Sequence, residues 1–135
     1  MLTFVSESDS QNFFKEWKKI NINNKLALFK DYWNPKIIGE LNQQHVKLVK
    51  LKGEFIWHKH DNEDELFLVV KGKLKIAFRD KTVSIDENEL IIIPKGVEHK
   101  PIAEKEVSVL LFEPKNTLNT GDQKDNFTKD NLDWI

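Results

Sequence analysis

The chain has 135 residues, enough for a single domain with its own hydrophobic core. It contains no cysteine, which excludes disulfides, thiolate metal sites and cysteine nucleophiles. The net charge is −1 and Arg79 is the only arginine, so neither a general attraction for nucleic acid nor a multi-arginine phosphate site is available. We therefore expect no nucleic-acid partner.

No segment has the length and apolar character of a membrane span. The first residues, MLTFVSESDSQ, lack the basic and apolar regions of a signal peptide. From these two observations we expect a cytoplasmic location and no membrane partner.

An aromatic N-terminal segment, residues 1–35, precedes the rest of the chain. Four apolar residues between Ser8 and Ile20 fall at helical spacing, and Ser8 can cap the helix that they predict. Residues 21–24 indicate a polar break, and the part that follows, up to Pro35, is ambiguous between a short helix and a strand. The predicted helix would pack on a sheet or on a second subunit, and on this basis we predict a homodimer. Its apolar residues are Phe13, Phe14, Trp17 and Ile20.

Residues 36–114 have the composition of a β domain. About eight short β-favouring runs alternate with turn signals and show no helical period, which is typical of a β-sandwich or barrel. In the run HVKLVKLKG the apolar phase changes between Leu48 and Val49, which indicates a bulge or a bent strand. The runs are KIIGEL, HVKLVKLKG, EFIWHKH, ELFLVV, KLKIAFR, TVSI, ELIIIP and VSVLLFE.

Residues 115–135 form a C-terminal tail. The stretch NTLNTGDQK is polar and predicts a loop. Thr128 could cap a last short helix that runs through Trp134.

Two of the four histidines lie one residue apart in the run EFIWHKH. On a strand, His58 and His60 point to the same side, so their imidazoles could share one cation. Glu65 follows a short acidic turn, and a hairpin there would bring its carboxylate back to the two histidines. Two histidines and one carboxylate leave coordination positions of a metal open.

A third histidine could complete this set. His99 follows the turn formed by Pro94 and Gly96, and a closed or sandwiched sheet would bring it against the first hairpin. His45 has no acidic partner at a useful spacing, and we interpret it as an ordinary surface histidine.

The pattern resembles the two motifs of the cupin superfamily. In the first motif, a glycine precedes His-x-His, a glutamate and a second glycine, and these places are taken by Gly53, His58, His60, Glu65 and Gly72. In the second motif, Pro-x-Gly-x-x-His, the places are taken by Pro94, Gly96 and His99. In detail the chain is similar to small single-domain bacterial cupins, over roughly residues 36–114.

The resemblance implies a mainly β fold, a jelly-roll cupin barrel of six to eight strands, to which the sequence adds an N-terminal helix and a short C-terminal helix. It also implies a frequent dimer and one divalent metal held by His58, His60, Glu65 and His99. The metal could be Fe, Mn, Ni, Zn or Cu. Glu65 could instead act as a base beside the metal. Two positions depart from the second motif, Asn88 in place of its first glycine and Ala103 in place of its closing asparagine, and neither is a metal ligand.

Two functions from different classes follow, together with a third, weaker alternative. The favoured one is a metal-dependent enzyme on a small organic substrate, with oxygenase chemistry for Fe(II) and isomerase or lyase chemistry for Zn, Mn or Ni. The alternative is a non-catalytic module that binds or senses a small molecule, and a weaker one is a metal-free barrel kept for its dimer interface. By strand alternation we expect an apolar substrate pocket lined by Phe67, Val69, Leu74, Ile76 and Phe78.

Overall fold

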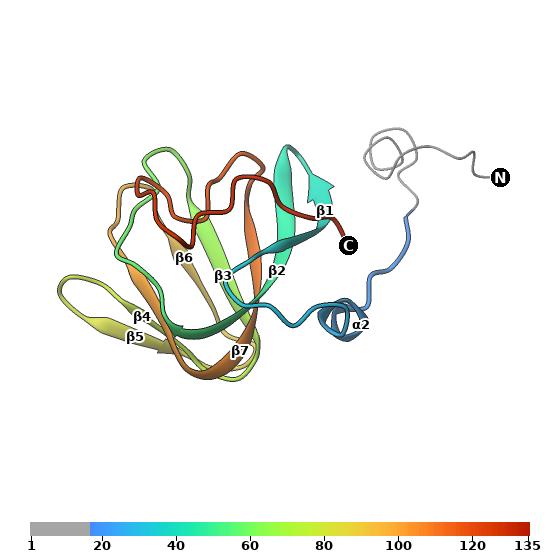
Figure 1. Cartoon of the computed structure of the whole chain (residues 1–135), viewed down its shortest axis with the longest axis horizontal. Coiled ribbons are helices and arrows are strands. Elements are labelled where there is room, and N and C mark those ends of the chain that lie inside the picture. Colours follow the sequence, from blue (N-terminus) through green and yellow to red (C-terminus); the bar gives the residue numbers. More distant parts are fainter. Residues whose placement is uncertain (1–16) are drawn as a thin grey trace.

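The computed structural model describes residues 17–135, which form one short helix and seven strands (Figure 1). No helix in this range is long and apolar enough to cross a membrane. The helix is α2 (Ile22–Leu26), and the strands are β1 (Lys36–Leu41), β2 (Gln44–Glu54), β3 (Glu65–Lys71), β4 (Leu74–Ala77), β5 (Thr82–Ile85), β6 (Leu90–Ile93) and β7 (Lys100–Pro114).

All strand pairs are antiparallel, and the longest strand, β7, organises them. The order β1-β2-β7-β3-β6 forms one continuous sheet, and the first residues of β7 also pair with β4, which pairs with β5. Because β7 contacts three strands along its 15 residues, the sheet curves around a common interior (Figure 1). The mainly β, jelly-roll barrel predicted from the sequence is confirmed.

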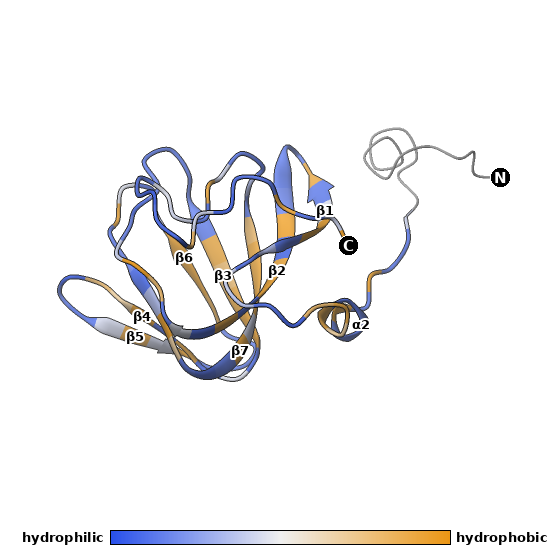
Figure 2. Cartoon of the chain, in the orientation of Figure 1, coloured by the Kyte–Doolittle hydropathy of each residue, from blue (hydrophilic) through white to orange (hydrophobic). Residues whose placement is uncertain are grey.

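The predicted bulge between Leu48 and Val49 is wrong, because β2 is covered on both faces. Val49 and Leu51 point into the main core, whereas Leu48 belongs to a second apolar cluster outside the barrel. Leu26 of α2 and Phe29 complete that second cluster, and the register of β2 with β7 is regular through Leu48 and Val49. A register shift comes only later, between Leu51 and Gly53. Apolar colouring on both the strand and α2 follows this contact (Figure 2).

Most of the helix predicted at residues 8–20 lies outside the described residues, and the described residues 17–20 are not helical. The helix α2 is a separate element. It begins in the predicted polar break, because the side chain of Asn21 accepts a hydrogen bond from the backbone N–H of Asn24 at 2.9 Å. At its other end, the Lys50 ammonium donates to the carbonyls of Leu26 and Phe29.

The predicted C-terminal helix is absent. Thr128 does not cap a helix, because its hydroxyl accepts from the backbone N–H of Asp125 and its own N–H bonds to the Asp125 carbonyl, which closes a turn. The chain end runs beside β1, where Trp134 bridges to Ile37. The tail is therefore a series of turns, and only its last residues run beside β1.

His45 is not the isolated surface histidine that we expected. It lies on β2 opposite Glu40 of β1, and its Nε2 is 3.2 Å from Oε1 of that residue. Trp134 covers the ring edge-on. The sequence analysis did not identify Glu40 as the partner of His45, because it is the hairpin between β1 and β2 that brings these two residues together.

Candidate metal centre

The segment that carries His58 and His60 is not a strand, although the sequence predicts one. The ladder between β2 and β7 stops after Glu54 and Ile102, and Phe55 then donates to the carbonyl of Pro101. Proline has no N–H to return that bond, so regular pairing ends there. Only an isolated bridge between His58 and His99 continues it.

The bridge places the two motifs side by side. His58 and His99 exchange both backbone hydrogen bonds, at 3.1 and 2.9 Å, and the N–H of Gly96 donates to the carbonyl of His60 at 2.7 Å. Gly96 has a φ of +82°, which glycine adopts without strain. Glu65 begins β3, with its side chain turned inward. Main-chain bonds thus fix the positions of all three histidines.

The four predicted metal-binding residues converge. His58, His60, Glu65 and His99 are all buried, and one ligand atom from each lies within 4.8 Å of the other three. Oε1 of Glu65 is 3.2 Å from Nε2 of His60 and 3.4 Å from Nε2 of His99. The group can hold a metal ion.

Backbone carbonyls orient two of the imidazoles. Nδ1 of His58 donates to the carbonyl of Ile56 at 3.0 Å, and Nδ1 of His99 donates to that of Val97 at 2.9 Å. Because a carbonyl only accepts, each Nδ1 carries the proton and each Nε2 keeps its lone pair. A hydrogen bond from the far ring nitrogen is the usual support of a metal-binding histidine.

The protonation states of His58 and Glu65 also suit a cation. Burial, followed by the neighbouring His99, lowers the pKa of His58 to about 4, so this ring is neutral at pH 7. Burial alone would raise the pKa of Glu65, but the imidazoles of His60 and His99 hold the pKa well below its usual range. Burial would lower the pKa of His60, and the Glu65 carboxylate reverses this and raises the pKa. A neutral ring and an ionised carboxylate are the forms that bind metal.

Several polar atoms of the group lack hydrogen-bond partners within residues 17–135. They are Nδ1 and Nε2 of His60, Oε1 of Glu65 and Nε2 of His99, all buried. Buried polar atoms are normally satisfied, so a missing partner needs an explanation. A cation among these nitrogens and this oxygen would satisfy the Nε2 and Oε1 atoms, and three nitrogens with one carboxylate oxygen suit Fe, Mn, Ni, Zn or Cu.

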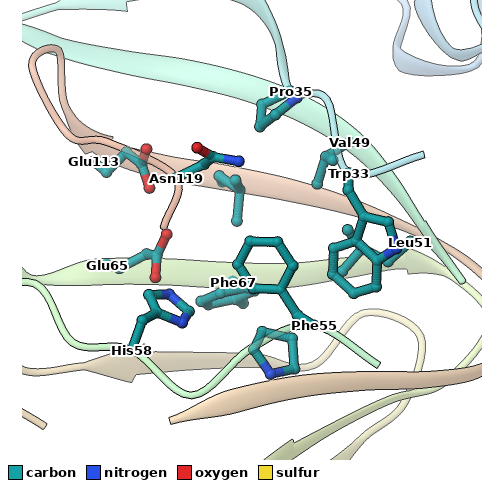
Figure 3. A pocket seen from close by; sticks show the side chains of 12 residues that line it. Trp33, Pro35, Val49, Leu51, Phe55, His58, Glu65, Phe67, Glu113 and Asn119 are labelled. Atoms are coloured by element: carbon teal, nitrogen blue, oxygen red, sulfur yellow. The ribbon is translucent and has the colours of Figure 1, made fainter. Parts of the chain in front are cut away.

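A cavity of about 40 Å³ adjoins the group (Figure 3). His58 and Glu65 line one end of it, and Glu113 and Asn119 add further polar groups. The other walls are apolar or aromatic, with the Trp33 and Phe55 rings stacked at a centroid distance of 4.7 Å. These walls are Trp33, Val49, Leu51, Phe55, Phe67 and Leu111.

Of the five residues expected to line a pocket, Phe67 lines this cavity. Val69, Leu74 and Ile76 are fully buried in the main core, and Phe78 lines a separate, open depression. The alternation of side chains along a strand predicts which face of the sheet a residue is on. It does not predict how far along the barrel that residue lies from the metal-binding group. Glu65 and Phe67 lie at the site end of β3, and Val69 lies further along the strand.

Lys47 and Glu113 form a buried ion pair that the sequence analysis missed. Nζ of Lys47 is 2.6 Å from Oε2 of Glu113, and each side chain is only 2% exposed. Burial, followed by the charge of Glu65, raises the pKa of Glu113 well above its usual value. A signal was present, because Lys47 has the same strand phase as Val49 and Glu113 the same phase as Leu111.

The C-terminal tail covers the histidine segment. Lys59 and Asp122 are joined by two hydrogen bonds, from Lys59 N–H to Oδ1 of Asp122 and from Asp122 N–H to the Lys59 carbonyl. Gly121, with a φ of +57°, lies so close that a Cβ there would collide with the Lys59 backbone. Asn119 of the same tail lines the cavity. The tail is thus part of the site's wall, which its polar composition did not indicate.

Known proteins are similar to this chain in sequence and in fold. A crystal structure of a cupin-2 domain containing protein from Shewanella frigidimarina is 48% identical, with a TM-score of 0.71 over 71% of this chain and 94% of that one. The protein NMB1881 from Neisseria meningitidis is 35% identical, with a TM-score of 0.67 over 73% of this chain and all of that one. The uncharacterized protein YdbB of Bacillus subtilis is 44% identical over 64 residues, 47% of this chain, and the match spans only 57% of YdbB.

A family model agrees with these likenesses. The model described as Cupin domain matches residues 45–113, which hold both histidine motifs. The match covers half of the chain and includes His58, His60, Glu65 and His99. This chain belongs to the cupin domain family.

Proposed function

We propose that the protein is a metal-dependent enzyme that acts on a small organic molecule. One divalent ion would be held by His58, His60, Glu65 and His99. The observation that carries the proposal is the convergence of four buried ligand atoms at the end of a largely apolar cavity. Such a cavity, with few polar groups, suits a small organic ligand.

The chain's own residues prepare the site for this role. A bound divalent ion would supply Lewis-acid chemistry as Zn, Mn or Ni, or oxygen chemistry as Fe(II). The carbonyls of Ile56 and Val97 keep the Nε2 atoms of His58 and His99 free of protons. The closeness of Glu65 to two imidazoles supports a role as a ligand more than as a base. The Phe55 ring lies edge-on to His58 at a centroid distance of 5.3 Å and the Phe67 ring edge-on to His99 at 6.3 Å, so aromatic side chains flank the metal-binding group.

Metal content tests the first half of the proposal. Protein purified without a chelating tag should contain close to one divalent ion per chain by elemental analysis. The double variant His58→Ala/His60→Ala should lose it, and His45→Ala should keep it, because His45 is a buried histidine outside the group. Equal metal content in all three proteins would show that the ion, if bound, lies elsewhere.

Turnover tests the second half. Oxygen uptake should be measured on the Fe(II)-loaded protein with diketones, phenols and thiol acids, and ketose–aldose pairs should be tested with Zn, Mn and Ni. The small cavity, about 40 Å³, is the observation that favours the alternative, a module that binds a compact molecule without converting it. Metal binding with no turnover of any of these compounds would favour the binding module.

We also propose a homodimer. Of the apolar residues that suggested one, Phe13 and Phe14 lie outside the described residues, and Trp17 and Ile20 are 95% and 44% exposed. Support comes from the edge strand β6, whose outward side chains Leu90 and Ile92 are 55% and 57% exposed. Light scattering should give twice the chain mass of 15.9 kDa, and a monomer mass would remove the proposal.

A further inference from the structure

Polar side chains in the wall of the cavity already have partners within the chain. The Trp33 indole N–H donates to the carbonyl of Lys52 at 2.9 Å. The Asn119 side chain donates to the carbonyl of Phe127 and accepts from the N–H of Lys129, both at 2.8 Å. The hydrogen bonds of these two side chains therefore hold the wall in place.

The carboxyl group of Glu113 is engaged in the same way. One of its oxygens lies 2.6 Å from the Lys47 ammonium, and the group shares a hydrogen bond with the side chain of Glu65. His58, the remaining polar residue of the wall, donates from Nδ1 to the carbonyl of Ile56. The metal ion that His58 and Glu65 would help to bind is therefore the polar contact that the described part of the chain offers to a ligand in this cavity.

The other residues of the wall carry apolar side chains (Figure 3). Two of them, Pro35 and Pro101, also lack a backbone N–H that could face a ligand. The carbonyl of Pro101 is occupied, because it accepts from the N–H of Phe55 at 3.0 Å. A hydroxyl or amide group placed against this wall would lose its water without gaining a partner, and such a loss weakens binding by about tenfold or more.

The volume limits the part of a ligand that enters the cavity. About 40 Å³ holds roughly three waters, or a group of three or four non-hydrogen atoms. A sugar, with a hydroxyl group on almost every carbon atom, is both too large and too polar for such a space.

We propose that the cavity selects ligands with a single metal-binding head group and a short apolar body, and that it excludes polyhydroxylated compounds such as sugars. Val49 and Leu111 belong to the apolar wall that would contact the body of the ligand. This inference rests on the proposed function, because the head group needs the bound ion. It narrows that function, because it removes ketose–aldose pairs from the candidate substrates.

Two probes of equal size test the proposal. Butyrate and 3-hydroxypropionate share a carboxylate head group and differ only at the last atom, which is a methyl group in butyrate and a hydroxyl group in 3-hydroxypropionate. Zinc-loaded protein labelled with ¹⁵N would be titrated with each, and the shifts of the Trp33 indole and Asn119 side-chain amide signals would report binding. We expect butyrate to bind about tenfold more tightly, because the wall offers its partner no hydrogen bond. Removal of zinc with EDTA should abolish the binding of both.

The variant Val49→Thr should reduce this preference severalfold. Threonine keeps the shape of valine and adds to the wall a hydroxyl group that can bond to the hydroxyl of 3-hydroxypropionate. Val109→Thr is the matched control, because Val109 is buried in the same core but does not line the cavity, so the preference should stay about tenfold. If Val49→Thr does not melt cooperatively, Leu111→Asn replaces it, because Leu111 also lines the cavity and asparagine has a similar shape.

Three results would overturn the inference. The first is equal affinity of the zinc-loaded wild type for the two probes, and the second is that neither probe shifts the two signals. The third is a preference that changes equally in the Val49 and Val109 variants, or in neither of them, because the cavity wall would then not be its source. Zinc content, measured in parallel, separates these results from failure of the proposed function, in which the wild type binds no zinc.

Discussion

Lowering the pH should destabilise the metal-free protein through His58. In the unfolded chain this imidazole takes up a proton near pH 6.5, whereas in the native protein burial lowers its pKa to about 4. Between these values the unfolded state binds more protons than the native state. The contribution of His58 to stability is therefore complete above pH 6.5 and is lost as the pH falls toward 4.

The size of the effect follows from the two pKa values. Each pKa unit corresponds to about 1.4 kcal/mol, so the fall from 6.5 to about 4 corresponds to about 3 kcal/mol of unfolding free energy. The side chain is 3% exposed, so solvent screening reduces this value little. For a domain of this size, 3 kcal/mol is a large part of the total stability.

Urea unfolding with EDTA present, at pH 7, 6, 5 and 4, measures the effect. His58→Gln removes the titrating group, so between pH 7 and 4 the wild type should lose about 3 kcal/mol more than the variant. Subtracting the two curves removes most of the contribution of the other acids and histidines. Parallel curves would refute the reasoning, since they would mean that His58 binds its proton equally well in both states.

Three further outcomes are expected. Lys47→Met should lower the free energy of unfolding by about 3 kcal/mol in urea, because it removes the ammonium that pairs with the buried Glu113 beside the negative Glu65. Lys47→Met/Glu113→Gln should recover most of that loss, and a single variant as stable as the wild type would contradict this prediction. Gly121→Ala should lower the free energy of unfolding by about 2 kcal/mol and weaken zinc binding, because the new Cβ would collide with the backbone of Lys59, next to His58. Unchanged zinc affinity in calorimetry would contradict the conclusion that the tail forms part of the site's wall. Zinc at a hundred times its dissociation constant should raise the free energy of unfolding by about 2.7 kcal/mol, reversibly with EDTA, and a melting temperature insensitive to zinc would contradict binding to the native state.

The sequence was most informative where function fixes both residue type and spacing. The two motifs identified His58, His60, Glu65 and His99, and the structure brings these residues together. Strand alternation also located the main core. Both signals depend on local periodicity, which the sequence displays directly.

The features that the sequence did not predict depend on contacts between distant parts of the chain. The strand predicted for the histidine segment does not form, because Phe55 pairs with Pro101, which cannot return a hydrogen bond. The two residues are far apart in the sequence, so this pairing could not be predicted from it. The phase change at Leu48 looked like a bulge because only the fold shows that α2 covers the outer face. The tail beyond Pro114 has loop composition, and nothing in it indicates that Gly121 and Asp122 pack on Lys59.

Lys47 and Glu113 are a different case. In the sequence, each is a charged residue at a strand position whose neighbours two residues away are apolar and point inward. A charged side chain at such a position is unusual in an apolar core. Pairing them required the register of β2 and β7, in which Lys47 lies opposite Leu111, two residues from Glu113. Charged residues in core phase are therefore worth noting before a structure is known.

The central claim is that four side chains from both motifs bind a single ion. Its most direct test is anomalous diffraction from crystals of the metal-loaded protein, recorded on both sides of the metal's absorption edge. We predict one peak per chain, about 2.0–2.3 Å from Nε2 of His58, His60 and His99 and from a carboxylate oxygen of Glu65. Fully loaded crystals with no peak among these four residues, or with the peak at another site, would contradict it.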